Sequence, residues 1–440
     1  MGGRASGFVS QLRSERAVLG GSLPHATTPG PRFMTSPLLL VLTLFASTIT
    51  VDDDGPADFT EISDAILAAA AGDVLLVEPG NYGPFFLDKD LSIVGRANQP
   101  RPNVAGPILI SRAPGFALSR LRLQAVTIEA VTDAGRMDDC RVRAQNNGGQ
   151  ALLIQGCAQI ELTRSRVTGN SPNAGNGGRA GRVTSSNVTT VDTDFIGGAG
   201  AVDVAEAPNN GGTGLRVDGG SHLLFVRGSV IGGAAGGAVD PRNQTCSFGQ
   251  SGRGLVLAGA TASLRGVPAD QVSGGAPGPR ACGGVTNAGL RLQGGASVVT
   301  SGVTINEVEQ GGGGGTLTTA TPFEPYLRNN GSSAPGGNGV LQLFGPASEV
   351  AILIASFDTT LTNVAGVQDT LWFDPATAFF AGALVSAGPA QPALCPYTIP
   401  EIAAHSGLAL RVQCVFTSLA GSLDPRTSAS SNAVDVIVNH

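Results

Sequence analysis

A strand of alternating polar and apolar residues recurs along the middle of the chain. Its five copies are Arg120–Leu123, Arg141–Ala144, Arg164–Val167, Asp192–Phe195 and Arg227–Val230. Residues two apart point to the same side of a strand, so Leu121 and Leu123 are expected to face inward, as are Val142 and Ala144. The first two copies begin 21 residues apart, and later intervals widen where glycine- and asparagine-rich inserts intervene. This period predicts a solenoid whose coils bury their apolar edges against one another.

A second recurring strand supports the solenoid. Its copies are Gly214–Val217, Gly254–Leu257 and Gly289–Leu292, and each leads into a turn that contains a glycine. The chain holds 64 glycines, while aromatic residues make up only 5% of it. That composition suits tight turns and stacked small side chains better than packed helices.

Residues 50–95 predict how the solenoid begins. Asp58 and Glu61 have the spacing of a capping box, so Asp58 is expected to cap a helix. Ile62 and Ile66 share one face of that helix, and Gly72 supplies its end. Short strands follow at Val74–Val77, Tyr82–Leu87 and Leu91–Val94.

This order of one helix and closely spaced strands resembles the start of a right-handed parallel β-helix of the pectate-lyase-like kind. In that family a helix covers the open end of the solenoid, where unpaired backbone groups need a cover. The resemblance implies an all-β fold over residues 49–315. It implies no particular activity.

The pattern changes after the glycine run Gly311–Gly315. Residues 316–338 are predicted to be a linker or cap, and residues 339–440 a small β-sandwich-like domain. Three stretches resemble the C-terminal β-domain of exported bacterial proteins: Gly339–Gly345, Leu371–Pro375, and Leu410–Gln413 followed by Ser431–Ala433. The resemblance implies an accessory or surface-association role without a catalytic motif.

An apolar run at Leu38–Ala46 suits the core of a secretory signal and is too short to span a bilayer. Residues 1–48 are therefore predicted to be an upstream extension and signal peptide, with Met1 or Met34 as the start. No other segment has the length and apolarity of a membrane span. The net charge of −6 argues against nucleic acid as a partner. We expect a secreted or cell-surface monomer.

Six cysteines suggest disulfide bonds in an exported chain. The expected pairs are Cys140 with Cys157, Cys246 with Cys282, and Cys395 with Cys414. Cys246 and Cys282 precede matching glycines of the second repeat, so a bridge between them is expected to join two long loops. No CxxC motif or Cys/His cluster is present, so no metal site or cofactor is predicted. Asp52, Asp53 and Asp54 could ligate Ca²⁺, but no specific motif supports it.

The aligned strands place arginines on one outer face of the predicted solenoid. The candidate ligand-binding residues are Arg120, Arg122, Arg141, Arg143, Arg164 and Arg166. Neighbouring coils stack about 4.8 Å apart, so like charges repel and need counter-charges. Acidic neighbours such as Asp138, Asp139 and Glu161 could supply them and leave a solvated, salt-bridged face. Alternatively, the guanidinium groups await an anionic ligand such as a uronate-bearing polysaccharide.

A catalytic site is conceivable where the charge changes sign. Arg164 and Arg166 would then lie beside Asp192 and Asp194 on the next coil. Polysaccharide lyases of this fold use a basic proton-abstracting side chain, and its hydrolases use paired carboxylates. Two hypotheses stay open: an exported protein that presents a binding face for acidic polysaccharide or a surface structure, and a carbohydrate-active enzyme. Fold analogy alone supports the enzyme.

Overall fold

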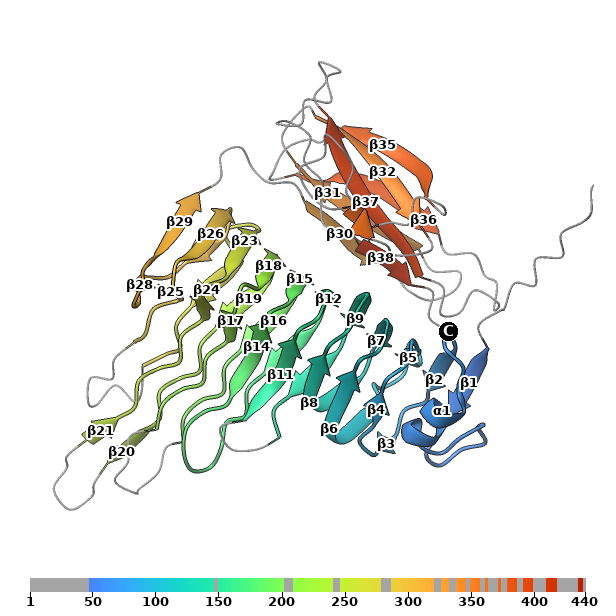
Figure 1. The fold of residues 1–440 in the computed structure, drawn as a ribbon, viewed down its shortest axis with the longest axis horizontal. Coiled ribbons are helices and arrows are strands. Elements are labelled where there is room, and N and C mark those ends of the chain that lie inside the picture. Colours follow the sequence, from blue (N-terminus) through green and yellow to red (C-terminus); the bar gives the residue numbers. More distant parts are fainter. Residues whose placement is uncertain are drawn as a thin grey trace, which may run out of the picture. The chain divides into compact units, whose positions relative to one another are not determined.

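A computed structural model describes residues 47–145, 149–201, 209–239, 246–277, 286–319 and 326–331, and thereafter 338–345, 349–356, 361–362, 371–372, 378–385, 391–398, 409–417 and 434–437. Residues 47–319 build a solenoid of parallel strands, with one antiparallel pair, β20 (Gly237–Val239) and β21 (Cys246–Phe248), in an insert (Figure 1). Residues 326–437 build a domain of antiparallel strands.

Face 1 of the solenoid is an eleven-stranded parallel sheet. Its strands, from the N-terminal end, are β1 (Thr48–Val51), β2 (Val74–Val77), β5 (Ser92–Gly95), β7 (Phe116–Ser119), β9 (Ala134–Asp138), β12 (Gln159–Thr163), β15 (Asn187–Val191), β18 (His222–Val226), β23 (Thr261–Arg265), β26 (Ala296–Ser301) and β29 (Gly315–Thr319).

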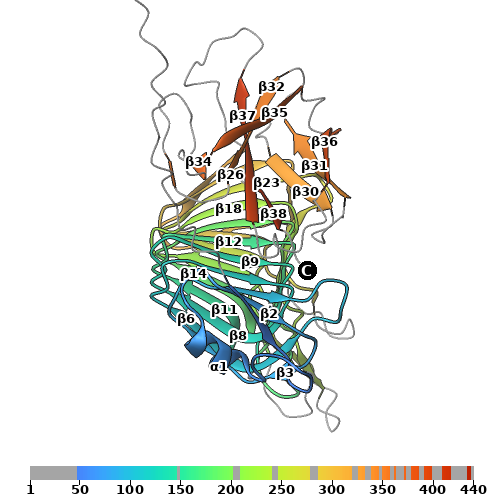
Figure 2. The ribbon, with the colours of Figure 1, turned by 90° about the vertical axis from the view of Figure 1, so that its right-hand side faces the viewer.

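A second parallel sheet divides at the long strand β8 (Arg122–Glu129), which pairs with one arm through each of its halves. Face 2 continues through β10 (Arg141–Arg143), β13 (Arg166–Thr168), β16 (Asp194–Ile196), β19 (Ser229–Ile231), β24 (Gln271–Ser273) and β27 (Thr304–Ile305). Face 3 continues through β11 (Gln150–Gln155), β14 (Arg179–Thr184), β17 (Leu215–Asp218), β22 (Leu255–Ala258), β25 (Leu290–Gln293) and β28 (Val308–Gln310). The sheet starts with β3 (Asn81–Tyr82), β4 (Phe86–Leu87) and β6 (Asn103–Ser111). Each full coil visits all three faces (Figure 2).

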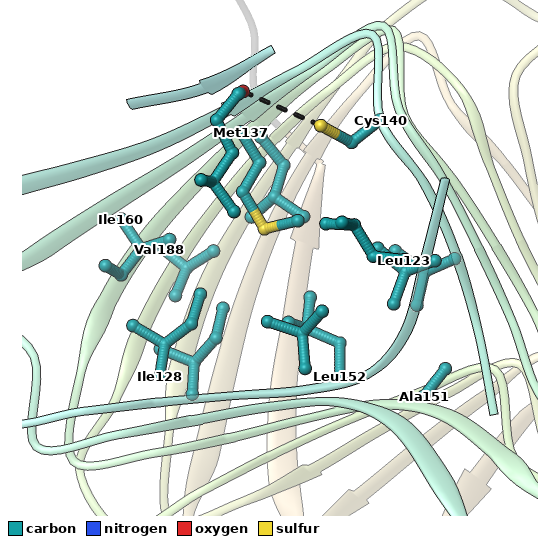
Figure 3. Packing of buried hydrophobic residues seen from close by; sticks show 14 of the residues in the cluster. Leu123, Ile128, Met137, Cys140, Ala151, Leu152, Ile160 and Val188 are labelled. Atoms are coloured by element: carbon teal, nitrogen blue, oxygen red, sulfur yellow. Dashed lines mark hydrogen bonds between the residues drawn. The ribbon is translucent and has the colours of Figure 1, made fainter. Parts of the chain in front are cut away.

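Apolar side chains from the three faces meet inside the coils (Figure 3). Met137 comes from face 1, Leu123 from β8 on the face 2 side, and Leu152 from face 3, and all three are at most 2% exposed. The expected inward residues of the first repeat, Leu121, Leu123, Val142 and Ala144, are all buried. These observations confirm the predicted parallel β-helix and its repeat.

Helix α1 (Ile62–Ala68) covers the N-terminal end through buried Ile62 and Ile66. The predicted capping box is wrong, because Glu61 is itself the N-cap residue and makes no side-chain cap. Asp58 instead accepts hydrogen bonds from the Thr50 backbone and hydroxyl, both at 2.8 Å. Lys89 Nζ donates to Ile66 O at 2.9 Å, so a lysine satisfies carbonyl groups at the end of the helix.

Small polar side chains stack inside the corner between faces 1 and 2. Cys140, Ser165 and Thr193 fill this corner in three successive coils, and each follows a residue with positive φ. Each side chain donates to the carbonyl oxygen two residues before it, at 3.4 Å for Cys140, 2.8 Å for Ser165 and 3.1 Å for Thr193. We call these positions corner slots.

Cys157 and Ser186 occupy equivalent slots at the corner between faces 3 and 1, where each donates to the carbonyl oxygen two residues earlier. Cys140 and Cys157 thus belong to different corners. Both are buried, unbridged thiols. The predicted disulfide between them is wrong, because the two cysteines are close along the chain but fill different corners of the coil.

We expect Cys140→Ser and Cys157→Ser to leave the thermal unfolding temperature nearly unchanged, because serine already fills the same slots as Ser165 and Ser186. Burial raises the pKa of the Cys140 thiol to about 12, and it also raises the pKa of Cys157. Since the thiolate is the reactive form, neither should react with a maleimide in the folded protein. Peptide mapping after labelling measures this, and rapid native-state labelling of either residue would contradict the buried slots.

Glycines stack where the coils cross from face 2 to face 3. Gly198 N–H donates to Gly178 O at 2.8 Å, Gly212 N–H to Gly198 O at 2.8 Å, and Gly233 N–H to Gly212 O at 2.7 Å. The bonds alternate between segments that leave face 2 and segments that return to face 3. We call the series the glycine spine: Asn170, Gly178, Gly198, Gly212, Gly233, Gly252 and Gly275.

Close approach of backbones requires glycine at positions such as Gly198 and Gly212 of the spine. A Cβ on Gly198 would collide with the carbonyl group of Asn170, and one on Gly212 with that of Gly178. The backbone N–H groups of residues 197–201 bond to neighbouring segments on two sides, and the pattern repeats every three residues. Gly197 and Gly200 donate to one side, to Ile231 O and Ala234 O, while Gly198 and Ala201 donate to the other, to Gly178 O and Gly175 O. Three residues per turn is the period of a polyproline II helix. The described parts of these segments are therefore laterally bonded extended chains.

The C-terminal domain has two main antiparallel sheets. The first is β30 (Tyr326–Gly331), β31 (Asn338–Phe344) and β36 (Ala393–Thr398); the second is β35 (Phe379–Val385), β32 (Val350–Ser356), β37 (Ala409–Thr417) and β38 (Val434–Ile437); β33 (Leu361–Thr362) pairs with β34 (Leu371–Trp372). Leu341 and Leu343 of the first sheet share one core with Leu353 and Val412 of the second. The shared core confirms the predicted β-sandwich-like domain.

The predicted disulfide between Cys395 and Cys414 is also wrong. Cys395 lies on β36 and Cys414 on β37, in different sheets, and neither of these described residues is disulfide-bonded. Strands β29 and β30 enter the stretch predicted as a linker, so the domain boundaries stay predictions.

Two further predictions fall outside the described part of the chain. The apolar run of the signal peptide precedes residue 47, and Cys282 of the predicted Cys246–Cys282 bridge lies in the gap before residue 286. Within the described ranges, no helix has the length and apolarity to cross a membrane.

Candidate functional site

An outward-facing row of polar side chains runs along face 2, parallel to the solenoid axis. The pairing register places Arg122, Arg141 and Arg166 side by side, one per coil, followed by Asp194. Asn103 precedes Arg122 in the same row. We call these five residues the outer row. Because adjacent strands lie about 4.8 Å apart, successive arginines start at that spacing.

A groove of about 540 Å³ lies over β8, β10 and β13. It is lined by the three arginines of the outer row, by Arg143, and by the amide side chains of Gln124 and Gln145 among others. None of the described lining residues is aromatic. The groove is therefore a cationic, hydrogen-bonding surface.

Three of these arginines are exposed and have no carboxylate partner in the part of the chain that the structure describes. Within the described residues, Arg122, Arg141 and Arg143 form no ion pair, whereas Arg166 donates to Asp194 Oδ2 from Nη2 at 2.9 Å. Elsewhere many arginines of the molecule are matched. Arg182 and Arg216 both contact Asp218, and Arg253 and Arg291 both contact Glu309. The groove thus gathers arginines without carboxylate partners among the described residues, whereas these other arginines are neutralised by carboxylates.

Two predicted ligand-binding residues lie away from the groove, in the corner between faces 1 and 2. The corner residues with positive φ alternate in charge from coil to coil: Arg120, Asp139, Arg164, Asp192 and Arg227. Arg120 lies 3.6 Å from Asp139, which also pairs with Arg101 at 2.6 Å, and Arg227 lies 3.4 Å from Asp192. We call this series the corner ladder. Its ion pairs tie neighbouring coils together, so Arg120 has a structural partner. Arg164 has one in Asp138, the residue before Asp139.

Arg164 makes the most enclosed of these pairs, with Asp138. Its Nη2 and Nε donate to the two carboxylate oxygens at 2.6 and 3.1 Å, and Thr163 Oγ1 donates to Asp138 at 2.6 Å. Burial alone would raise the pKa of Asp138, but the charges of Arg164 and Arg136 and these hydrogen bonds outweigh it and hold that pKa below the ordinary value. The charge of Asp138 in turn raises the pKa of Arg164.

The register corrects the alignment of the first repeat. Arg141 pairs with Arg122 and Arg166, so Arg141–Ala144 is displaced by two residues from the alignment that matched it with Arg120. Arg143 consequently lies beside Gln124 and Thr168. The displaced alignment left Gln124, Gln145 and Thr168 unrecognised as groove residues, although an outward position two residues after Arg122 or Arg166 would have indicated two of them.

The four catalytic candidates do not form one cluster. Arg164 binds Asp138, Asp192 belongs to the corner ladder with Arg227, and only Arg166 and Asp194 meet, on face 2. Asp194 is held by a guanidinium rather than facing a second carboxylate. This arrangement can bind anions, but it supplies no carboxylate pair for hydrolysis.

Two clusters of like-charged side chains lie outside face 2. On face 3, Arg179 lies near Arg182 and Arg216, and burial, with the charges of Arg216 and Arg182, lowers its pKa. Asp52, Asp53 and Asp54 bring carboxylate oxygens within 4.8 Å of one another near the N-terminal end, where they could hold a cation. Asp53 already accepts a hydrogen bond from Asn81 N–H at 2.9 Å.

Comparison with known proteins gives structural likeness at very low sequence identity. The full-length tailspike protein 2 of an Escherichia coli bacteriophage is 9% identical, with a TM-score of 0.29, over 85% of this chain and 61% of that one. The enzymatically active domain of tailspike protein 4 of bacteriophage CBA120 is 10% identical, with a TM-score of 0.25, over 82% of this chain and 67% of that one.

The chain therefore spans about three fifths of the length of the full-length tailspike. No family model matches the sequence, and no curated protein does either. The strand pairing itself carries the classification: this chain is a parallel β-helix protein with a C-terminal antiparallel β-domain.

Proposed function

We propose that the protein is an exported or cell-surface protein that binds an acidic polysaccharide in the groove on face 2. The observation that carries this proposal is the set of three exposed arginines, Arg122, Arg141 and Arg143, without carboxylate partners among the described residues. Exposed like charges on adjacent strands destabilise a sheet, so their retention side by side favours a ligand that neutralises them. A guanidinium group binds carboxylate or sulfate groups through two parallel hydrogen bonds.

The direction of the outer row fits a linear polymer. Stacked arginines repeat along the solenoid axis, so anionic groups on an extended chain could meet one coil after another. The amide side chains of Gln124 and Gln145 add neutral hydrogen-bonding groups suited to sugar hydroxyls. A lyase or hydrolase remains an alternative on fold analogy, and the separation of Asp192 from Asp194 gives it no support.

We expect the triple variant Arg122→Gln, Arg141→Gln, Arg143→Gln to lose retention on an immobilised acidic polysaccharide such as polygalacturonate. Glutamine keeps the side-chain length and removes the charge, so affinity should fall by about tenfold or more. The wild-type protein should elute at lower salt from a ligand of lower charge. Such a ligand forms fewer exposed ion pairs, and less salt is needed to screen them.

The matched control is Arg112→Gln, Arg182→Gln, Arg291→Gln, which removes three positive charges outside the groove. Asp218 keeps Arg216 and Glu309 keeps Arg253, so no carboxylate loses its last partner. Equal loss of retention in both triple variants would show that net charge, and not the groove, governs binding. Release of unsaturated or reducing sugars by the wild type would favour the enzyme instead.

A further inference from the structure

Asp194 ends the outer row with a charge opposite to that of its arginines. Its carboxylate Oδ2 accepts from Arg166 Nη2 at 2.9 Å and from Arg166 Nε at 3.3 Å. Face 2 continues past Asp194 through β19, β24 and β27, where Ser229, Gln271 and Thr304 lie side by side. Along face 2, the arginines of the outer row are therefore followed by one acidic residue and then by neutral side chains.

The pair that Asp194 forms is an exchangeable one. The Arg166 side chain is 59% exposed, and exposed ion pairs are weak because water screens them. A ligand anion could replace Asp194 on Arg166, but it would then lie one strand spacing from the displaced carboxylate. Repulsion between the two anions works against that exchange.

We infer that Asp194 limits the anionic part of the ligand to the coils of Arg122 and Arg141. Arg166 stays paired with Asp194 and does not bind a ligand anion. The inference rests on the proposed function and specifies its ligand class. The preferred ligand is a linear polysaccharide whose anionic units occupy the first two arginine coils and whose neutral units continue over Ser229 and Gln271. A uniformly charged polymer is bound less well, because its third anion meets Asp194.

Asp194→Asn tests this directly, since it keeps the shape of the side chain and removes its charge. We expect the variant to bind polygalacturonate about fivefold more tightly than the wild type, because the change relieves one repulsion and frees the Arg166 guanidinium to bind the third anion. Digalacturonate, which is satisfied by Arg122 and Arg141, should show a much smaller gain. Isothermal titration at constant ionic strength measures both affinities.

Two controls identify the cause of a gain. Asp64→Asn, on the exposed surface of α1, makes the same change of net charge far from face 2. An Arg166→Gln variant removes the guanidinium that Asp194→Asn would free. Adding Asp194→Asn to it should therefore give a smaller gain in polygalacturonate affinity than in the wild-type background. Thermal unfolding of each variant establishes that it is folded.

The outcomes separate the inference from the proposed function. Binding by the wild type with no gain in Asp194→Asn, or with the same gain in Asp64→Asn, overturns the inference alone. Weaker binding by Asp194→Asn would mean that the carboxylate positions Arg166 for the ligand, which also overturns it. Absence of wild-type binding to both galacturonate ligands overturns the role of Asp194 and leaves the proposed function to be judged on other acidic polysaccharides.

Discussion

Gly212→Ala is expected to destabilise the solenoid by about 3 kcal/mol or more, the upper range for overpacking in a site that cannot relax. A methyl group at this position would occupy the space of the Gly178 carbonyl group. The clash would also separate Gly212 N–H from Gly198 O and Gly233 N–H from Gly212 O, each bond worth about 1 kcal/mol net. Because a Cβ has a position fixed by the backbone and would meet only backbone atoms, no side-chain rotation can relieve the clash.

Chemical denaturation of Gly212→Ala and of Gly312→Ala measures this effect. Gly312 lies in the turn after β28, has open space around its Cα and has no positive φ, so alanine should be tolerated there. Amide hydrogen exchange should also quicken in the segments beside Gly212. Similar unfolding free energies for the two variants would show that the glycine spine contributes little to stability.

Asp138→Asn is expected to cost about 3 kcal/mol at neutral pH, the range for breaking an enclosed ion pair by removing one partner. The substitution leaves the Arg164 guanidinium without the carboxylate that accepts two of its hydrogen bonds. Asp139→Asn is the matched control. The Asp139 side chain is 27% exposed against 2% for Asp138, and asparagine tolerates positive φ well. A smaller loss is expected there.

The contribution of Asp138 should depend on pH in a defined direction. Its folded-state pKa lies below the ordinary value of 3.8, so its stabilising contribution is complete above that pH. The contribution is lost as pH falls through the depressed folded-state pKa. The difference in unfolding free energy between wild type and Asp138→Asn should therefore shrink below pH 3.8. A difference that stays constant into that range would contradict the ion pair.

The sequence predicted the solenoid because apolar residues two apart must share the inside of a strand. Leu121, Leu123 and Val142 followed this rule and are buried. The groove was predicted less well, since paired arginines alone did not fix the register. Aligning the corner slots would have fixed it: Cys140 matches Ser165 and Thr193, and this alignment places Arg141 beside Arg166.

Other features depended on distances across the coil that local patterns do not contain. Cys140 and Cys157 lie 17 residues apart in sequence yet fill different corners. The glycine spine pairs Gly198 with Gly178 and Gly212, partners that are set by how two neighbouring inserts align. Turn-forming composition was visible in these inserts, but their hydrogen bonds were not.

The glycine spine also determines how a ligand would be received. Thr168 and Asn170 line the groove, and Asn170 is the first residue of the spine. Long polar loops beside a binding surface commonly fold over a ligand and lose conformational entropy on doing so. Segments that are already bonded on two sides have little such entropy left to lose. Recognition at this edge of the groove would then be selection by a preformed wall, with the ordering of the loop completed when the chain folds.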